Sequence, residues 1–259
     1  MDRAAVSGRL SVIGLGPGDT AQMTPEAAAA VSTADFLFGY GPYLERLSLG
    51  PGQARVPSDN REELSRARAA LAKAAGGASV AVVSGGDPGV FAMAAAVCEA
   101  IEAGPHDWRE VELAIVPGVT AMLAVAARVG APLGHDFCAM SLSDNLKPWD
   151  LIERRLDAAS AAGFVIAIYN PVSRARPWQL GRAFDCLRRN LPGTTPVVFG
   201  RAAGRPDERI EVSPLAGADP ARADMATCVI VGSPETRGID RGGRPPLIYT
   251  PRFSAGSMR

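Results

Sequence analysis

The sequence contains little histidine and cysteine, and the few residues of these types are not grouped. Its only histidines are His106 and His135, and its four cysteines are spread along the chain without a Cys-x-x-Cys pair. We therefore expect neither a zinc or haem site of the Cys/His type nor a disulfide framework. The functional site is predicted to hold no metal.

The sequence also lacks an excess charge of either sign and any long apolar run. Its 27 Lys and Arg residues balance 27 Asp and Glu residues, so the formal net charge is zero. Because nucleic-acid-binding proteins usually carry a basic excess, we expect no nucleic-acid partner. No run approaches the roughly 18 apolar residues of a spanning helix, and the first ten residues lack the apolar region of a signal peptide. The sequence predicts a cytoplasmic protein without a membrane partner.

Strand and helix signals alternate along the chain, which predicts an α/β fold with a largely parallel sheet. Asn60 and Glu63 resemble a capping box that starts one of the helices. In the first half, the expected strands cover residues 10–14, 36–40, 80–84 and 111–116, and the expected helices cover 24–30, 60–75, 90–102 and 121–129. In the second half, the expected strands cover 137–141, 164–169, 196–199, 209–212 and 227–231, and the expected helices cover 149–161 and 178–190.

A change of character after Gly130 indicates a domain boundary within residues 118–132. We predict an N-terminal α/β domain over residues 1–120 and a C-terminal α/β domain over 121–236. Residues 237–259 contain Gly, Pro and Arg with little periodicity, so they are predicted to form a partly disordered tail.

Three turns rich in Gly and Pro follow expected strands of the first half: Gly14–Asp19, Gly85–Gly89 and Pro117–Thr120. In open α/β sheets, ligands bind at the edge where the strands end. Glycine lets the backbone approach a ligand, and the amides at a following helix N-terminus can bind an acceptor group. Turn chemistry alone often demands Gly and Pro, but three such turns on one edge favour a ligand site.

The first turn differs from the common nucleotide-binding motifs. A G-x-G-x-x-G match would need glycine where Asp19 stands, and Pro17 stiffens the turn. A G-x-x-x-x-G-K-[ST] phosphate loop is absent from the sequence. NAD and ATP are therefore disfavoured as ligands.

In their order and spacing, the three turns resemble those of the tetrapyrrole methylase superfamily, and the resemblance covers residues 10–235. It implies two α/β domains with S-adenosylmethionine in the cleft between them. Further segments resemble the precorrin-3B C17-methyltransferase branch: Phe38–Tyr40 with Tyr43 and Leu44, Gly134–Asp144, Ile168–Pro171 with Ser173 and Arg174, and Ala203–Pro206 with Glu208.

That branch methylates C17 of precorrin-3B and contracts the ring to precorrin-4 in cobalamin biosynthesis. The resemblance leaves open a cobalt-factor III methyltransferase or a methylase of another precorrin carbon. A non-catalytic α/β module that senses the cofactor is a further alternative. Family resemblance and chain size also predict a homodimer.

The resemblance implies cofactor contacts from both domains. Instead of contacting the cofactor, Asp87 and Thr120 could be turn or helix-cap residues. Val90 and Phe91 could likewise be ordinary core residues. The implied cofactor-binding residues are Pro17, Gly85, Gly86, Asp87, Val90, Phe91, Thr120, Ala121, Tyr169, Asn170 and Ala202.

A tetrapyrrole substrate carries many carboxylates, which arginine binds bidentately. All but two of the 27 cationic residues are arginine, which we interpret mainly as codon bias, so a solvated surface charge is the alternative for each candidate. The candidates for binding substrate carboxylates are Arg61, Lys147, Arg174, Arg176, Arg201 and Arg205.

Methyl transfer from a sulfonium needs no protein nucleophile, and the sequence shows no nucleophilic triad. Ring contraction should need a base and an acid. His135 is a candidate because its ordinary pKa lies near neutrality, and Ser143 and Asp144 lie in the same segment. A structural histidine that orients a turn is the alternative.

Overall fold

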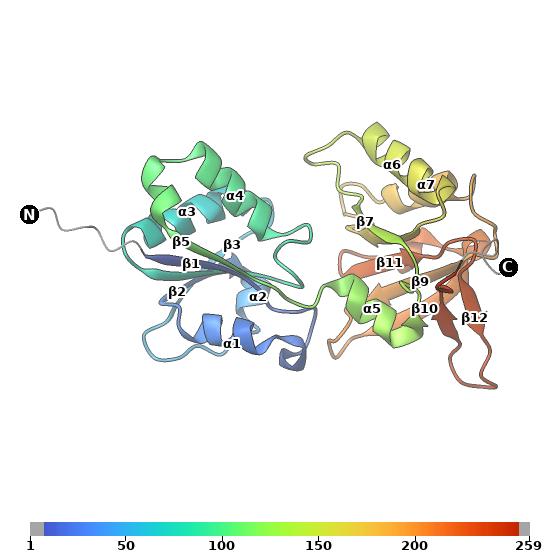
Figure 1. The fold of residues 1–259 in the computed structure, drawn as a ribbon, viewed down its shortest axis with the longest axis horizontal. Helices are drawn as coiled ribbons and strands as arrows, with labels where there is room; N and C mark the ends of the chain where they lie inside the picture. The colour runs from blue at the N-terminus through green and yellow to red at the C-terminus, as the bar shows by residue number, and fades with distance from the viewer. Residues whose placement is uncertain (1–7, 254–259) are drawn as a thin grey trace, which may run out of the picture. The chain divides into compact units, whose positions relative to one another are not determined.

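The computed structural model describes residues 8–253, which form two compact units that divide between Thr120 and Ala121. Figure 1 draws the first unit from blue to green and the second from green to red. Each unit is built on a five-stranded sheet of its own. Among the described residues, no helix is long and apolar enough to cross a membrane.

The first unit holds a wholly parallel sheet in the order β3-β2-β4-β1-β5. Successive side chains of a strand point to opposite faces. Leu10 and Val12 of β1 therefore pack with α3 and α4, while Ile13 packs with α1 and α2; Figure 1 shows these helix pairs on the two faces. The strands are β1 (Arg9–Gly14), β2 (Phe36–Tyr40), β3 (Ala54–Ser58), β4 (Ser79–Ser84) and β5 (Glu112–Val116), and the helices are α1 (Pro25–Ser32), α2 (Gly41–Leu44), α3 (Glu63–Ala75) and α4 (Met93–Ala103).

The second unit holds a mixed sheet in the order β10-β9-β11-β8-β7, in which only β7 and β8 pair in parallel. The expectation of a largely parallel sheet is therefore wrong for this unit. The link between β9 and β10 is too short for a parallel crossover, which needs about a dozen residues or more. The elements are α5 (Ala121–Val129), β7 (Phe137–Ser141), α6 (Trp149–Ala161), β8 (Val165–Tyr169), α7 (Gln179–Leu187), β9 (Pro196–Arg201), β10 (Arg209–Pro214) and β11 (Thr227–Val231).

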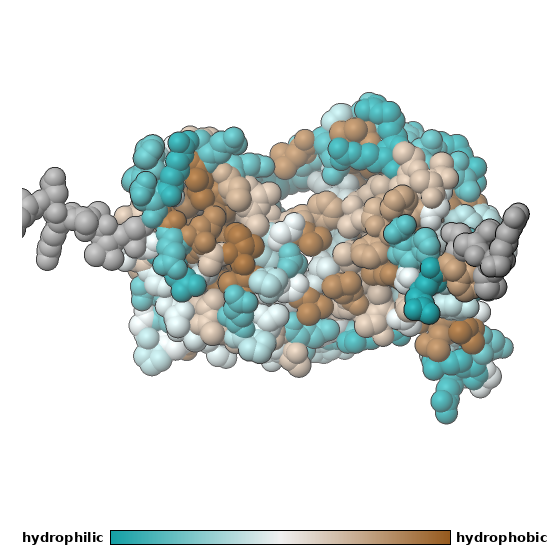
Figure 2. Space-filling view, in the orientation of Figure 1, coloured by the Kyte–Doolittle hydropathy of each residue, from teal (hydrophilic) through white to brown (hydrophobic). Residues whose placement is uncertain are grey.

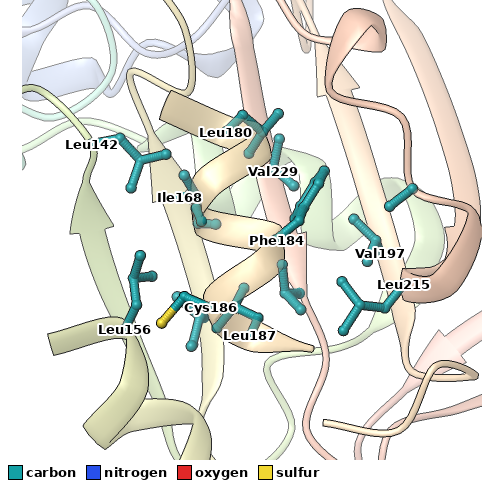
Figure 3. Close-up of a cluster of buried hydrophobic side chains, with 14 of the residues drawn as sticks. Leu142, Leu156, Ile168, Leu180, Phe184, Cys186, Leu187, Val197, Leu215 and Val229 are labelled. Atoms are coloured by element: carbon teal, nitrogen blue, oxygen red, sulfur yellow. The ribbon is translucent and has the colours of Figure 1, made fainter. Parts of the chain in front are cut away.

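The main core of the second unit lies between its sheet and helix α7. Phe184 projects from α7 toward the strands and meets Phe199 of β9 in an edge-to-face contact, with ring centroids 6.1 Å apart. Figure 3 shows Ile168 of β8 and Val229 of β11 beside it, all of them fully buried. This core fixes the carboxyl ends of β7 and β8, from which several candidate site residues project.

The described part of the tail contains regular structure that the sequence analysis missed. Strand β13 (Leu247–Tyr249) pairs with β12 (Arg237–Ile239) and in parallel with β6 (Gly130–Ala131). Figure 2 shows the tip of the β12–β13 hairpin as hydrophilic. The Thr250 hydroxyl donates to the Pro132 carbonyl at 2.6 Å, which joins the tail to the segment before β7. The predicted disorder over residues 254–259 lies outside the described residues.

Helix starts also differ from the sequence expectations. The capping box at Asn60 does not form, because α3 begins at Glu63 and its N-cap residue, Glu62, makes no side-chain cap bond. The helix expected from Val90 begins at Met93, since the preceding residues form a turn in which Val90 N donates to the Asp87 carbonyl at 3.3 Å.

Candidate functional site

The three Gly/Pro loops of the first unit emerge from neighbouring strands. Gly85–Gly89 follows β4, Gly14–Asp19 follows β1 and Pro117–Thr120 follows β5, and these strands are adjacent in the order β4-β1-β5. Because the strands are parallel, all three loops lie at one edge of the sheet. This is the edge at which α/β sheets bind ligands.

Glycines let these loops approach one another at backbone distance. A Cβ on Gly118 would lie 2.3 Å from the Gly86 oxygen, and a Cβ on Gly14 would lie 2.6 Å from the same oxygen. Gly16 and Gly86 exchange two backbone hydrogen bonds of 3.1 and 2.9 Å, both with a left-handed φ near 70°. The loop cluster therefore requires glycine at these positions, because a larger residue would clash or be strained there.

Asp87 joins the second loop to the third. Its Oδ2 accepts from Gly118 N at 3.0 Å, and its Oδ1 accepts from Gly89 N at 2.8 Å. Of the two alternative roles considered for Asp87, it does act as a turn residue. It does not cap a helix, because α4 begins six residues later. The carboxylate fixes the relative position of two of the loops.

The remaining candidates of the first unit lie around this cluster. Pro17 and Thr120 are buried, whereas the Phe91 side chain is half exposed and its backbone has a φ of 53°. Phe91 is therefore not an ordinary core residue, because half of its side chain is exposed. A Cβ on Gly85 would lie 2.8 Å from the Tyr43 ring, so this glycine leaves room for the tyrosine.

In the second unit, Tyr169 is the last residue of β8 and Asn170 follows it directly. The Tyr169 hydroxyl accepts from Met122 N at 3.0 Å, at the start of α5, where Ala121 is the first residue. The Asn170 amide donates to the Ser141 hydroxyl at 2.9 Å, which links the ends of β8 and β7. The structure brings these residues together.

Ala202 lies apart from β8, directly after β9. Its backbone has a φ of 50°, and its N–H donates to the Ala226 carbonyl at 2.9 Å. An alanine in the left-handed region is strained, since only glycine adopts it freely. Local strain of this kind occurs preferentially at functional sites.

The structure separates the three catalytic candidates. His135 precedes the amino end of β7, whereas Ser143 and Asp144 follow its carboxyl end. A five-residue strand spans about 13 Å, so His135 does not share one reacting centre with the other two. Their proximity in sequence does not make a cluster, because an extended strand lies between them.

Asp144 has partners just before α7 and at its first residue. Its Oδ1 accepts from Arg176 Nη1 and from Gln179 Nε2, the latter at 2.9 Å. Gln179 is buried and also donates to the Leu142 carbonyl at 2.9 Å. Gln179 could not be predicted from the sequence, because a glutamine at a helix start gives no motif signal. These bonds tie the loop after β7 to α7.

The cationic candidates differ in how fully their charge is compensated. Arg176 pairs with Asp144, and Arg201 pairs with two aspartates, which raise the pKa of its guanidinium. Lys147 forms no ion pair with any described residue, and burial together with the nearby Arg155 lowers its pKa.

The other cationic candidates lie in loops. Arg61 is exposed and has a left-handed φ of 69°, with its N–H donating to Glu63 at 3.3 Å. Arg174 and Arg205 are exposed in the loops after β8 and β9. Arg61 belongs to the first unit and the other five candidates to the second, so the six do not form one cluster within a single unit.

Metal ligands are not grouped in the described part of the chain. No group of three or more His, Cys, Asp or Glu side chains there is placed to hold an ion, and the four cysteines are unpaired. Burial raises the pKa of Cys228 to about 12.

Comparison with known proteins decides the family. A family model described as tetrapyrrole (corrin/porphyrin) methylases matches residues 9–219. The chain belongs to the tetrapyrrole methylase family. A tetrapyrrole methylase from Sinorhizobium sp., named precorrin-3B C(17)-methyltransferase, is 69% identical over 98% of this chain and 100% of its own. A relative from Salmonella typhimurium, named probable cobalt-factor III C(17)-methyltransferase, is 42% identical over 94% of this chain and 98% of its own.

Solved structures of tetrapyrrole methylases have the same fold. The crystal structure of the methyltransferase CobJ matches with a TM-score of 0.90 and 49% identity, covering 95% of this chain and 100% of that one. A uroporphyrin-III C-methyltransferase from Thermus thermophilus, complexed with S-adenosylhomocysteine, matches with a TM-score of 0.65 at 23% identity, which shows the fold alone. The predicted family, mixed α/β fold class and methyltransferase activity are confirmed. The roles of individual residues stay predictions.

Proposed function

We propose that this protein uses S-adenosylmethionine to methylate C17 of precorrin-3B, with contraction of the ring to precorrin-4, in cobalamin biosynthesis. A relative that matches nearly the whole chain is named for the C17 methylation. The structural observation that carries the proposal is the cluster of three loops at the ends of β4, β1 and β5, joined by Asp87.

The residues of this chain fit such a cofactor. Gly14 and Gly118 let the three loops meet at backbone distance, because a Cβ on either glycine would clash with the Gly86 oxygen. Phe91 adds an exposed aromatic side chain, and Tyr169 an aromatic ring at the end of β8. Small-molecule sites are mainly apolar with a few fixed polar groups, and these residues supply both kinds.

S-adenosylmethionine supplies a methyl group that its sulfonium already activates for transfer. The protein has to hold the acceptor carbon in line and exclude water, and it needs no nucleophile of its own. The loop cluster serves positioning, because main-chain hydrogen bonds between Gly16 and Gly86 and the bonds of the Asp87 carboxylate join its loops.

Substrate carboxylates need cations that are not already neutralised inside the protein. Lys147 has no carboxylate partner among the described residues, and Arg174 lies exposed in the loop after β8. We assign carboxylate binding to these two residues and to Arg61. Arg176 and Arg201 are held by aspartates, so we assign them to loop positioning.

Activity is tested with purified protein, radiolabelled S-adenosylmethionine and precorrin-3B. A labelled product with a contracted ring is expected by mass spectrometry, and its absence would contradict the proposal. Asp87→Asn should weaken binding of S-adenosylhomocysteine. The matched control is Asp219→Asn, because Asp219 makes the same local bond, to Ala221 N at 2.9 Å, outside the loops.

Ring contraction is tested separately at His135. We propose that His135 acts as the acid or base of this step, because imidazole is the commonest side chain in general acid–base catalysis. His135→Ala should then give methylated product without contraction in a single turnover. His106→Ala is the control, since His106 lies in a short 3₁₀ helix of the first unit. A contracted product from His135→Ala would remove this histidine from the mechanism.

The cobalt-containing substrate is a second candidate, because the Salmonella relative is named for cobalt-factor III. The two candidate substrates are precorrin-3B and the cobalt-containing tetrapyrrole for which the Salmonella relative is named. Comparing kcat/KM for precorrin-3B and cobalt-factor III decides between them, and the higher value identifies the physiological substrate.

We further propose a cytoplasmic homodimer. Leu113 and Ile115 project from the same side of the edge strand β5 and are 37% and 44% exposed, which favours burial against a partner. Light scattering of the purified protein should give twice the mass of one chain, and Ile115→Ser should shift it toward the monomer. Cell fractionation tests the location.

A further inference from the structure

Arg46 joins the segment after α2 to the first glycine loop. Its Nη2 atom donates to the main-chain oxygens of Leu15, Gly16 and Gly18, at 3.2, 3.2 and 2.5 Å. The guanidinium is partly buried, so these charge-assisted bonds are shielded from water. One side chain thereby fixes the direction of three carbonyls in one short loop.

A second arginine holds the segment that carries Arg46. Arg55 of β3 donates from Nε to the Leu44 carbonyl at 3.2 Å and from Nη2 to the Leu47 carbonyl. Both carbonyls flank Arg46 in the sequence. The edge strand β3, α2 and the first loop are thus connected through side-chain bonds to main-chain oxygens.

These bonds bear on how the loops pair. The C=O and N–H of one peptide unit point in opposite directions because the unit is planar and trans. By holding the Leu15 carbonyl, Arg46 directs Gly16 N away from itself, and that N–H donates to the Gly86 carbonyl at 3.1 Å. The Arg46 contact therefore favours the pairing of the first and second loops.

We propose that Arg46 is a positioning residue that keeps the Gly14–Asp19 loop in its cofactor-binding conformation. The proposal rests on the proposed function, because it takes this loop as part of the S-adenosylmethionine site. It also requires arginine rather than lysine. A guanidinium spreads its donors over a planar fork, whereas an ammonium is a compact point donor on a flexible stem.

Two measurements on Arg46→Gln test the proposal. Amide hydrogen exchange of peptides covering residues 10–24, without ligand, should become faster. Calorimetry should show a Kd for S-adenosylhomocysteine about tenfold above the wild-type value, as expected when one molecule in ten has the binding-competent loop. At saturating cofactor, kcat should change little, and Arg46→Lys should recover only part of the affinity.

Arg188→Gln is the matched control. The Arg188 guanidinium also donates to main-chain carbonyls, those of Leu215 and Ala218, but these lie outside the loops. Its loss should leave the Kd unchanged. A wild-type Kd and wild-type exchange in Arg46→Gln, or an equal loss of affinity in Arg188→Gln, would overturn the proposal. If the wild-type protein binds no S-adenosylhomocysteine while Arg46→Gln still loosens the loop, the proposed function fails and the structural role of Arg46 stands.

Discussion

Replacing Gly118 with alanine tests whether the close approach of the three loops is needed for activity. The new methyl group would lie 2.3 Å from the Gly86 oxygen and 2.9 Å from the Gly14 Cα and carbonyl carbon. All of these are main-chain atoms, so no flexible side chain can turn aside. The loops after β4, β1 and β5 have to separate.

The size of the effect follows from these distances. Carbon and carbonyl oxygen in contact lie about 3.3 Å apart or more, so the Gly86 carbonyl has to move by about 1 Å. Overpacking of this kind costs about 1–3 kcal/mol of unfolding free energy. For a chain of this length, that lowers Tm by roughly 2–12 °C. A displacement of about 1 Å at a site can reduce activity about 100-fold.

The assay compares Gly118→Ala with Gly41→Ala, which makes the same chemical change where nothing lies within 4 Å of the added Cβ. Circular dichroism gives Tm, calorimetry gives the Kd for S-adenosylhomocysteine, and labelled methyl transfer gives kcat/KM. We expect Gly118→Ala to lose affinity and activity while folded, and Gly41→Ala to match the wild type. Wild-type affinity and activity in Gly118→Ala would refute the assignment of the loop cluster to the cofactor.

Three further predictions concern charge and thiol chemistry. Lys147→Gln should raise the substrate KM about tenfold, because the substrate loses one hydrogen bond to a charged group. Arg201→Gln should raise KM less, because Arg201 is already paired with two aspartates. Steady-state kinetics measures both KM values. The hydrogen bond from Arg128 lowers the pKa of Glu208, so the pair stabilises the fold above the unfolded pKa and loses this effect as pH falls through the lower folded pKa. Arg128→Gln should therefore lower Tm slightly at pH 7 and lower it less at acidic pH, where Glu208 becomes protonated, and an equal Tm difference at both pH values would contradict this. Cys228 should resist iodoacetamide at pH 8 until the protein is denatured, as mass spectrometry can check, because burial raises its pKa to about 12.

The sequence predicted most elements that have strong local signals. Strands β1 and β4 are apolar runs followed by Gly/Pro turns, and both were located to within about a residue. The three loops were placed on one sheet edge from the order of strands and turns alone. Their adjacency was not predictable, because it depends on β4 and β5 pairing on either side of β1, a tertiary choice.

Elements with weak local signals were missed. Strand β3 contains Pro57, which argues against a central strand, and β3 indeed lies at the edge of its sheet, where a missing N–H is tolerated. Strands β12 and β13 have three residues each, too few for a periodic pattern. Arg46 was missed because its acceptors are main-chain oxygens about 30 residues away, which no motif records.

Backbone conformation gives a pointer to the site that is independent of motif resemblance. Among residues 8–253, the non-glycine residues with positive φ are Arg61, Phe91, Asn170 and Ala202. Each was named from the sequence as a cofactor or substrate contact, although φ played no part in that choice. Such conformations cost about 1–3 kcal/mol each and persist only where the surroundings enforce them. Because glycine would adopt the same backbone without strain, the presence of a side chain at Phe91 and Ala202 is most simply explained if the side chain itself is used.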